Sequence, residues 1–316
     1  MDDLLALFPD VADALNIESV AIVEKDYYIV ELLRLLQPLN FESHQLVFSG
    51  GTALCKAGIS LNRMSEDVDI KLVPCADFFY RHSRSKRRTI RKSVIKKIAD
   101  SIVATEIFTL DTQNQKNTRD EYRYSEIPVR YPQRYVQAPC LRPFIRLELI
   151  ETLLLEDCVH RHIVSLVTGL SGQGESINAF PCATIVSTQA EKIISILRRT
   201  AAIKRNVTRE DDALLIRHVY DNFCIVREVG KNIPTLRKFI MGCIKQDIER
   251  YGNQHLEFCI SPIEELKLGL YELGRNPIYR ERYQKFVAPM VFGQVQIGWD
   301  EAYTCLLETA LDAFES

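Results

Sequence analysis

The spacing of hydrophobic residues predicts an N-terminal part that mixes helices with strands. Apolar residues recur at helical spacing or alternate as in strands, and Pro38 ends the second helix. The expected helices are 3–15, 18–37, 52–58 and 77–108. The expected strands are 44–48, 66–72, 122–131, 144–151 and 158–168. The order of these elements predicts an α/β fold built on a mixed sheet, of the kind classed as α+β.

The remainder of the chain has a helical pattern throughout. Helices are expected at 188–203, 209–223, 233–250, 262–273 and 299–314. The segment 170–176, Leu-Ser-Gly-Gln-Gly-Glu-Ser, has the composition of a linker. We therefore expect two domains, an α/β domain over 1–175 that includes the N-terminal helices and an all-helical domain over 176–316.

Composition excludes several classes of protein. The 316 residues are 47% hydrophobic and 26% charged, which is typical of a globular chain and not of a disordered one. The formal net charge is -2, so attraction for nucleic acid has to come from local patches. Nine cysteines without a Cys-x-x-Cys pair, the lack of a basic leader and the lack of a long apolar run predict a cytoplasmic protein with reduced thiols and no membrane span.

The candidate chemistry lies around residues 50–69. Gly50-Gly51-Thr52 follows an expected strand and opens a helix, so its backbone amides, with the Thr52 hydroxyl, suit a phosphate. Asp67 and Asp69 are two residues apart on a strand and share one face. Two carboxylates this close suit a divalent cation, and Mg²⁺ prefers carboxylates together with phosphate oxygens. Tight turns and solvated acidic strands are the alternatives for each motif taken alone.

These residues resemble the first motif of the AbiEii/AbiGii nucleotidyltransferase toxins, in the DNA polymerase β-like nucleotidyltransferase superfamily. The resemblance rests on Gly50-Gly51-Thr52-Ala53-Leu54 and on Arg63-Met64-Ser65-Glu66-Asp67-Val68-Asp69-Ile70. Weaker matches are Glu24-Lys25-Asp26-Tyr27-Tyr28, the helix Glu191-Lys192-Ile193-Ile194-Ser195-Ile196, and Arg217-His218-Val219-Tyr220-Asp221. His218 departs from the family pattern, in which aspartate is usual.

The resemblance implies transfer of a nucleoside monophosphate from an NTP, with loss of pyrophosphate, by a toxin of a toxin–antitoxin or phage-defence system. It assigns two Mg²⁺ ions to Asp67 and Asp69. Nucleotide binding would fall to Gly50, Gly51, Thr52, Arg63 and Ser65. Lys192 would contact the triphosphate, and Asp221 would be the later acidic residue.

A third carboxylate is usual in the superfamily, and Glu148 is the candidate. Arg146 and Glu148 share one face of the strand 144–151, opposite apolar neighbours. Glu148 would ligate metal or accept the proton of the acceptor hydroxyl. The alternative is a surface pair between Arg146 and Glu148, and Glu126 and Glu151 are less favoured candidates.

Basic residues gather in 81–97, a stretch without an acidic residue. Phosphate contacts with RNA would explain them, and a solvated helix face is the alternative. The expected RNA-binding residues are Arg84, Lys86, Arg87, Arg88, Arg91 and Lys92. A second cluster comprises Arg198, Arg199, Lys204, Arg205 and Arg209.

Another set of residues, Cys158, His160 and His162, shares a strand face. This arrangement makes zinc conceivable, although no fourth ligand has clear spacing. Ordinary strand packing is the alternative to a zinc site.

The leading hypothesis is an Mg²⁺-dependent nucleotidyltransferase toxin that acts on RNA, with tRNA as the expected acceptor and a cognate antitoxin as a possible partner. One alternative is a non-catalytic module that binds RNA or a protein, which the departure at His218 motivates. Another is a phosphotransferase, which ranks lower because the chain has no Gly-x-x-x-x-Gly-Lys-Ser/Thr loop and no kinase signature.

Overall fold

The computed structural model describes residues 2–56, 58–59, 61–111, 117–138, 141–207, 211–292 and 297–315. It divides into two compact units. The first unit comprises 1–58 and 64–183, and the second comprises 59–63 and 184–316. The chain therefore passes from the first unit to the second between Ala183 and Thr184, and the short segment 59–63 belongs with the second.

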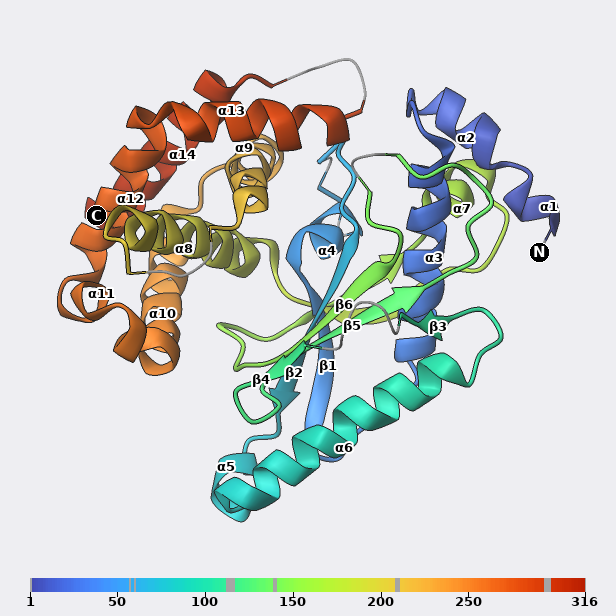
Figure 1. Ribbon diagram of the computed structural model, residues 1–316, viewed down its shortest axis with the longest axis horizontal. Coiled ribbons are helices and arrows are strands. Elements are labelled where there is room, and N and C mark those ends of the chain that lie inside the picture. Colours follow the sequence, from blue (N-terminus) through green and yellow to red (C-terminus); the bar gives the residue numbers. More distant parts are fainter. Residues whose placement is uncertain are drawn as a thin grey trace. The chain divides into compact units, whose positions relative to one another are not determined.

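A mixed sheet forms the centre of the first unit (Figure 1). Within the described residues it has eight strands: β1 (His44–Ser49), β2 (Asp67–Pro74), β3 (Thr109–Leu110), β4 (Asn117–Arg119), β5 (Tyr124–Arg130), β6 (Ile145–Glu151), β7 (Val159–Ile163) and β8 (Ile177–Cys182). The spatial order is β3-β5-β6-β2-β1-β8-β7, with β4 paired to β5. Because β2 runs antiparallel to β1 and parallel to β6, the sheet is mixed, as the sequence predicts.

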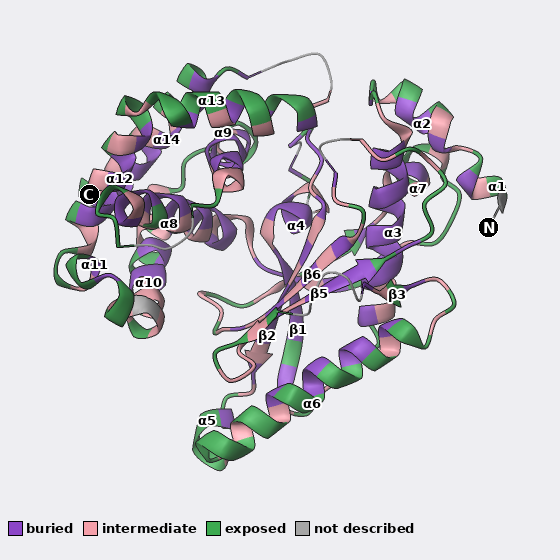
Figure 2. Ribbon diagram, viewed as in Figure 1, coloured by how far each residue is buried: buried purple, intermediate pink, exposed green. Residues whose placement is uncertain are grey.

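The helices of the first unit are α1 (Asp2–Leu5), α2 (Phe8–Ala14), α3 (Val20–Leu36), α4 (Gly50–Lys56), α5 (Phe78–Arg81), α6 (Arg84–Val103) and α7 (Leu166–Ser171). Helix α3 is buried along almost its whole length, whereas α6 has one buried stripe and a broad exposed surface (Figure 2). The apolar part of the α6 stripe includes Val94, Ile95 and Ile98, which recur at helical spacing. This face holds α6 in the unit and leaves its basic side chains outside.

The register of the central strands places acidic residues in one row across the sheet. Asp69 pairs with Ser49 of β1 on one side and with Glu148 of β6 on the other. Glu148 pairs in turn with Glu126 of β5. Like charges that face each other across strands destabilise a sheet unless another group offsets them. This row therefore marks a place where the fold accepts an electrostatic cost.

A buried charge cluster connects α6 to the sheet. Arg91 donates to both carboxylate oxygens of Glu151, at 2.6 and 2.8 Å, and His44 Nε2 lies 3.0 Å from Glu151 Oε2. Burial would raise the pKa of Glu151, but hydrogen bonds from His44 and Arg91 outweigh it and lower the pKa to about 2. The cluster therefore stabilises the fold while Glu151 is ionised.

We expect the Glu151 cluster to make stability dependent on pH. Because the pKa of Glu151 is lower in the folded state, its contribution is complete above about pH 4.5 and is lost as the pH falls towards 2. The free energy of unfolding of the wild type should therefore lose roughly 2–3 kcal/mol more over this interval than that of Glu151→Gln. Urea unfolding at a series of pH values measures the difference, and parallel curves would contradict the assignment.

The structure corrects the prediction for 158–168 and adds a strand. The segment forms β7 and then turns into α7, whose first turn is capped by the Ser165 hydroxyl. The expected linker 170–176 comprises the end of α7 and the turn that leads to β8, both in the first unit. Strand β8 was not expected, because it contains Pro181 and proline within a segment argues against a strand. It pairs with β1, which lies far earlier in the chain.

The second unit is helical, as the sequence predicts. Its helices are α8 (Ile185–Lys204), α9 (Arg217–Val229), α10 (Ile233–Tyr251), α11 (Leu256–Ile260), α12 (Pro262–Arg275), α13 (Pro277–Phe286) and α14 (Trp299–Glu315), with short 3₁₀ turns. A Cβ at Gly269 of α12 would overlap the backbone of Leu197 in α8. Glycine therefore allows these two helices to pack with their backbones in close approach.

Two further expectations concerned membrane-spanning segments and the state of the cysteines. No described helix is long and apolar enough to cross a membrane. The cysteines within the described ranges are all free, and Cys140 lies outside those ranges.

Candidate functional site

The glycine turn and the acidic strand meet at the end of β1. Gly50 directly follows β1 and has φ +78°, a conformation that suits glycine. A Cβ at this position would overlap the carboxylate of Asp69. Since Ser49 and Asp69 are paired in the sheet, the Asp69 side chain lies directly against the turn. The sequence places both motifs correctly, and the register explains their contact.

Thr52 fixes the backbone beside the first aspartate. Its side chain is buried, and its hydroxyl hydrogen-bonds to the Asp67 carbonyl oxygen and lies 2.9 Å from Ser65 Oγ. The Thr52 hydroxyl, expected to meet phosphate, therefore has partners within the protein. Ser65 remains half-buried beside Asp67.

Three carboxylates occupy neighbouring positions on one sheet face. Asp67 and Asp69 alternate with buried Val68 and Ile70, and Glu148 is the cross-strand partner of Asp69. Burial raises the pKa of Glu148, the nearby Asp67 and Glu126 carboxylates raise it further, and Arg146 opposes them. A carboxyl with a raised pKa is suited to exchange a proton near neutral pH. Glu148 also pairs with Arg146 at 3.1 Å. The Arg146–Glu148 pair, which the sequence offered as the alternative to a catalytic role for Glu148, is therefore present as well.

Two arginines hold Asp67. Arg146 Nη2 donates to Asp67 Oδ2 at 2.7 Å, and Arg142 Nη1 donates to Asp67 Oδ1 at 2.7 Å. Arg142 also donates to Glu66, which accepts from the buried Lys25 at 2.7 Å. Alternating charges therefore connect Lys25 of α3 through Glu66 and Arg142 to Asp67, the candidate metal ligand. Arg146 of β6 contacts the same carboxylate.

The sequence reasoning missed Arg142, Glu66 and Lys25 as parts of this site. Glu66 and Arg142 are 76 residues apart, so no local pattern connects them. One signal was available: a lysine and two acids in the middle of an apolar helix need partners, and Lys25 lies in such a run. Its neighbour Asp26 pairs with Lys56 at 2.6 Å and accepts from the Leu166 amide. The segment 24–28 thus anchors the elements around the site.

In the second unit, Lys192 of α8 and Asp221 of α9 form a buried ion pair at 2.8 Å. Arg63 donates to both oxygens of Asp221, each at 2.7 Å. Burial would raise the pKa of Asp221, but Arg63 and Lys192 outweigh it and hold the pKa well below its usual range. Asp221 is therefore an ionised carboxylate between two cations. Arg63, expected to bind nucleotide, is buried and pairs with Asp221.

His218, the departure from the family pattern, lies one helical turn before Asp221. Burial and the charge of Lys192 lower its pKa well below the usual range. Its Nδ1 atom is buried and has no hydrogen-bond partner among the described residues. His218 is therefore neutral at pH 7, where an aspartate would bring a negative charge.

The basic helix α6 exposes most of its expected RNA-binding residues. Arg84, Lys86, Arg88 and Lys92 are exposed, and Arg87 is half-buried against Phe79. Arg84 pairs with Glu121. Arg91 departs from the expectation, because it is buried and pairs with Glu151 and therefore has no access to a phosphate.

The second basic cluster has a different character. Its described members all pair with acidic side chains, Arg198 with Asp247, Arg199 with Asp212, Lys204 with Glu272 and Arg205 with Glu265. Arg209 lies outside the described residues. Cations that are already paired are weaker candidates for phosphate contacts than those of α6.

No group of three or more His, Cys, Asp or Glu side chains converges on a metal position in the described ranges. This finding disfavours zinc at Cys158, His160 and His162, which lie in or next to the edge strand β7. A magnesium site has a smaller requirement, because Mg²⁺ takes one or two carboxylates and completes its coordination with water and phosphate oxygens. The hard oxygen donors of Asp67 and Asp69 fit that requirement.

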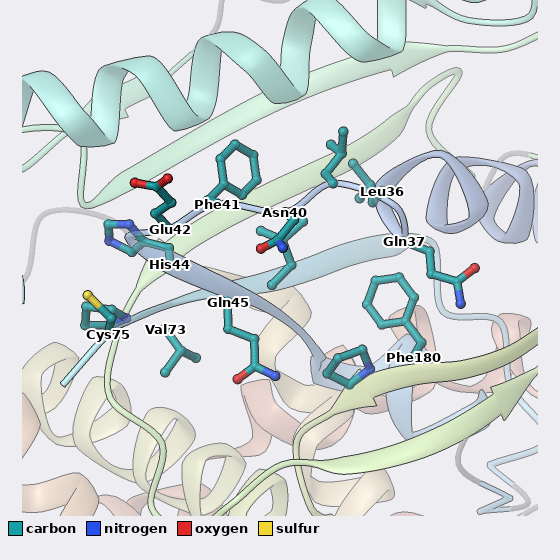
Figure 3. Close-up of a pocket in the computed structure, with 14 residues that line it drawn as sticks. Leu36, Gln37, Asn40, Phe41, Glu42, His44, Gln45, Val73, Cys75 and Phe180 are labelled. Carbon is teal, nitrogen blue, oxygen red and sulfur yellow. The ribbon is translucent and has the colours of Figure 1, made fainter.

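A pocket of about 320 Å³ lies elsewhere in the first unit (Figure 3). Its lining includes His44 and Gln45 of β1, Val73 of β2, Cys75 and Phe180. They lie towards the end of β1 opposite to Gly50, and His44 is about 20 Å from Gly50 along the strand at ~3.4 Å per residue. The pocket is therefore not part of the candidate active site.

Comparison with solved structures finds a protein of similar fold. One solved structure that matches is MenT4, a nucleotidyltransferase toxin from Mycobacterium tuberculosis H37Rv, with a TM-score of 0.55 and 17% sequence identity. The match covers 98% of this chain and 99% of MenT4, so the fold is shared over the full length. No curated protein matches the chain.

The sequence profile of the AbiEii family, described as the nucleotidyl transferase AbiEii toxin of a type IV toxin–antitoxin system, matches residues 33–305. The match extends over both units and includes the glycine turn, the acidic strand and the Lys192–Asp221 pair. The chain therefore belongs to the AbiEii family of nucleotidyl transferase toxins.

Proposed function

We propose that this toxin transfers a nucleoside monophosphate from an NTP to RNA, with tRNA as the acceptor, in an Mg²⁺-dependent reaction in the cytoplasm. The observation that carries the proposal is the contact between the Asp69 carboxylate and the Gly50 turn, next to Asp67 and Glu148. Nucleotidyl transfer requires positioning and charge neutralisation more than covalent chemistry. A glycine turn would position the phosphates, and divalent cations held by the paired carboxylates would neutralise their charge.

The residues of this site divide the work. Asp67 and Asp69 would hold divalent cations, which supply charge neutralisation for the triphosphate when bound. The backbone at Gly50, Gly51 and Thr52 would lie against the phosphates, with Ser65 beside them. Glu148, whose pKa is raised by burial, would accept the proton of the acceptor hydroxyl.

Lys192, Asp221 and Arg63 form a buried cluster of two cations and one anion, which has a net positive charge. Lys192 would stabilise the negative charge of the leaving pyrophosphate. Asp221 is wholly buried, so we assign it to positioning Lys192 and not to contact with the substrate. Arg63 would act in the same way, through Asp221.

Incubation of the protein with Mg²⁺ and total tRNA, with each NTP labelled at the α-phosphate and, in parallel, at the γ-phosphate, tests the proposal. Transfer of label to RNA with release of pyrophosphate is the expected result. Label that moves only from the γ-position, with release of a nucleoside diphosphate, would identify a phosphotransferase instead. No transfer with any NTP would contradict the proposal.

The family is described as part of a toxin–antitoxin system, which supports a search for the cognate antitoxin as a partner.

RNA binding is expected to depend on the exposed cations of α6. Replacing Lys86, Arg88 and Lys92 together by alanine keeps helix propensity and removes up to three phosphate contacts. The slope of log affinity for tRNA against log salt concentration should become shallower by about 2–3. Lys238→Ala with Lys245→Ala, on exposed positions of α10, is the control. An unchanged slope in the α6 variant would exclude this helix from the RNA interface.

A further inference from the structure

Both carboxylate oxygens of Asp67 are occupied by arginine. Arg142 Nη1 and Arg146 Nε donate to Oδ1 at 2.7 and 3.1 Å, and Arg146 Nη2 donates to Oδ2 at 2.7 Å. The two guanidinium groups are not locked in the core, because their side chains are 23% and 26% exposed. Asp67, which is expected to bind a cation, is thus held by two long side chains that are themselves positively charged.

The position of Arg142 is itself determined by the fold. Its backbone amide donates to Glu66 Oε2 at 2.8 Å, and its carbonyl oxygen accepts from Lys25 Nζ at 2.8 Å. Lys25 and Glu66 form a buried pair between α3 and the residue before β2. The backbone of Arg142 is therefore fixed next to Asp67, whereas its side chain, which is 23% exposed, extends to the carboxylate.

Arginine can leave Asp67 only by moving. A guanidinium stays protonated at any physiological pH, so it cannot yield the carboxylate by losing its charge. A divalent cation at Asp67 would face two positive groups at hydrogen-bond distance from the same oxygens. The exchange becomes favourable when the guanidinium groups find another anion, and phosphate oxygens match their bidentate geometry.

We infer that Arg142 and Arg146 act as an exchangeable clamp, which holds Asp67 in the empty protein and moves to the phosphates of the incoming nucleoside triphosphate. This inference rests on the proposed function and adds two positioning and phosphate-binding residues to its site. The clamp makes binding of triphosphate and of divalent cation cooperative, since each removes an obstacle to the other. In the absence of a triphosphate, the clamp neutralises Asp67, and Arg146 also pairs with Glu148 of the acidic row.

Two binding measurements without turnover test the clamp on Arg146→Gln. Mn²⁺ alone, titrated by electron paramagnetic resonance, should bind the variant about tenfold more tightly than the wild type, because about one charge-assisted hydrogen bond no longer competes. Inorganic triphosphate, titrated by calorimetry in EDTA, should bind about tenfold more weakly, because a phosphate contact is lost. Arg130→Gln, which removes a half-exposed arginine paired with Asp111 in the same unit, should change neither affinity.

The opposite signs distinguish the clamp from a structural role. If Arg146 only supported the fold, Arg146→Gln would weaken both ligands or change neither, and either result would overturn the inference. Arg142→Gln, on the loop before β6, repeats the test should thermal unfolding show that the first variant is not folded. The two affinities are independent of catalysis, so opposite shifts without label transfer to RNA would support the clamp and contradict the proposed function.

Discussion

Replacing Asp69 by asparagine is expected to lower nucleotidyl transfer to tRNA by about 10²–10³-fold or more, the loss typical of removing one preorganised charge-stabilising group. The substitution keeps the size of the side chain, so its packing against Gly50 should survive. It removes the negative charge and one of the two anionic oxygens available to a cation. Initial rates with a labelled NTP at saturating Mg²⁺ measure the effect.

Glu126→Gln is the matched control for Asp69→Asn. Glu126 lies in the same cross-strand row, two strands away from Asp69, so both variants lose one negative charge from one sheet face. Activity of Glu126→Gln should stay within a few-fold of the wild type. An equal loss in both variants would show that the row acts through its total charge, and Asp69 would lose its specific assignment.

Replacing Asp221 by asparagine is expected to cost about 3–5 kcal/mol of stability, the range for removal of one partner from a buried ion pair. Asp221 is 0% exposed and lies between Arg63 and Lys192, both buried. An asparagine offers one carbonyl oxygen and no charge, so two cations would be left in the interior without a counter-charge. The free energy of unfolding in urea measures the loss.

Asp300→Asn provides the comparison for the buried acid. Asp300 pairs with Arg280 at the surface, and its side chain is 75% exposed. Exposed ion pairs contribute about 0–1 kcal/mol, so this variant should be close to the wild type. If Asp221→Asn lost less than 1 kcal/mol, the Arg63–Asp221–Lys192 cluster would not be the fixed charge arrangement on which the assignment of Lys192 rests.

The local parts of the site could be predicted from the sequence, whereas their partners could not. Alternation in a strand places Asp67 and Asp69 on one face whatever the rest of the chain does. A glycine pair after an apolar strand is likewise a local signal. The family resemblance correctly joined the two motifs, and the AbiEii match confirms that resemblance.

Long-range pairing explains what was missed. The register between β2 and β6 sets Glu148 beside Asp69, and it also sets Arg146 beside Asp67. Arg142 reaches the same carboxylate from a loop, and Arg91 turns inward because Glu151 lies under α6. Hydrophobic periodicity carries no information about which charged residues will meet across a sheet, so the buried pairs had to be read from the structure.

In the helical unit, too, some elements could be predicted from local sequence and others could not. The long helices α8 and α10 were expected within a few residues of their observed bounds. The short α11 and the polar α13 were not, because five residues give too little periodicity and α13 has few apolar positions. Arg63 belongs to the second unit although it lies in the first motif, and its contacts with Asp221 and Val291 agree with that assignment.

The most direct test of the central claim is a crystal structure of the protein with Mn²⁺ and a non-hydrolysable NTP. The account predicts anomalous density for Mn²⁺ on the carboxylates of Asp67 and Asp69, and the triphosphate against the Gly50 turn. A triphosphate bound elsewhere, for example in the pocket beside His44, with Mn²⁺ absent from both aspartates, would contradict it.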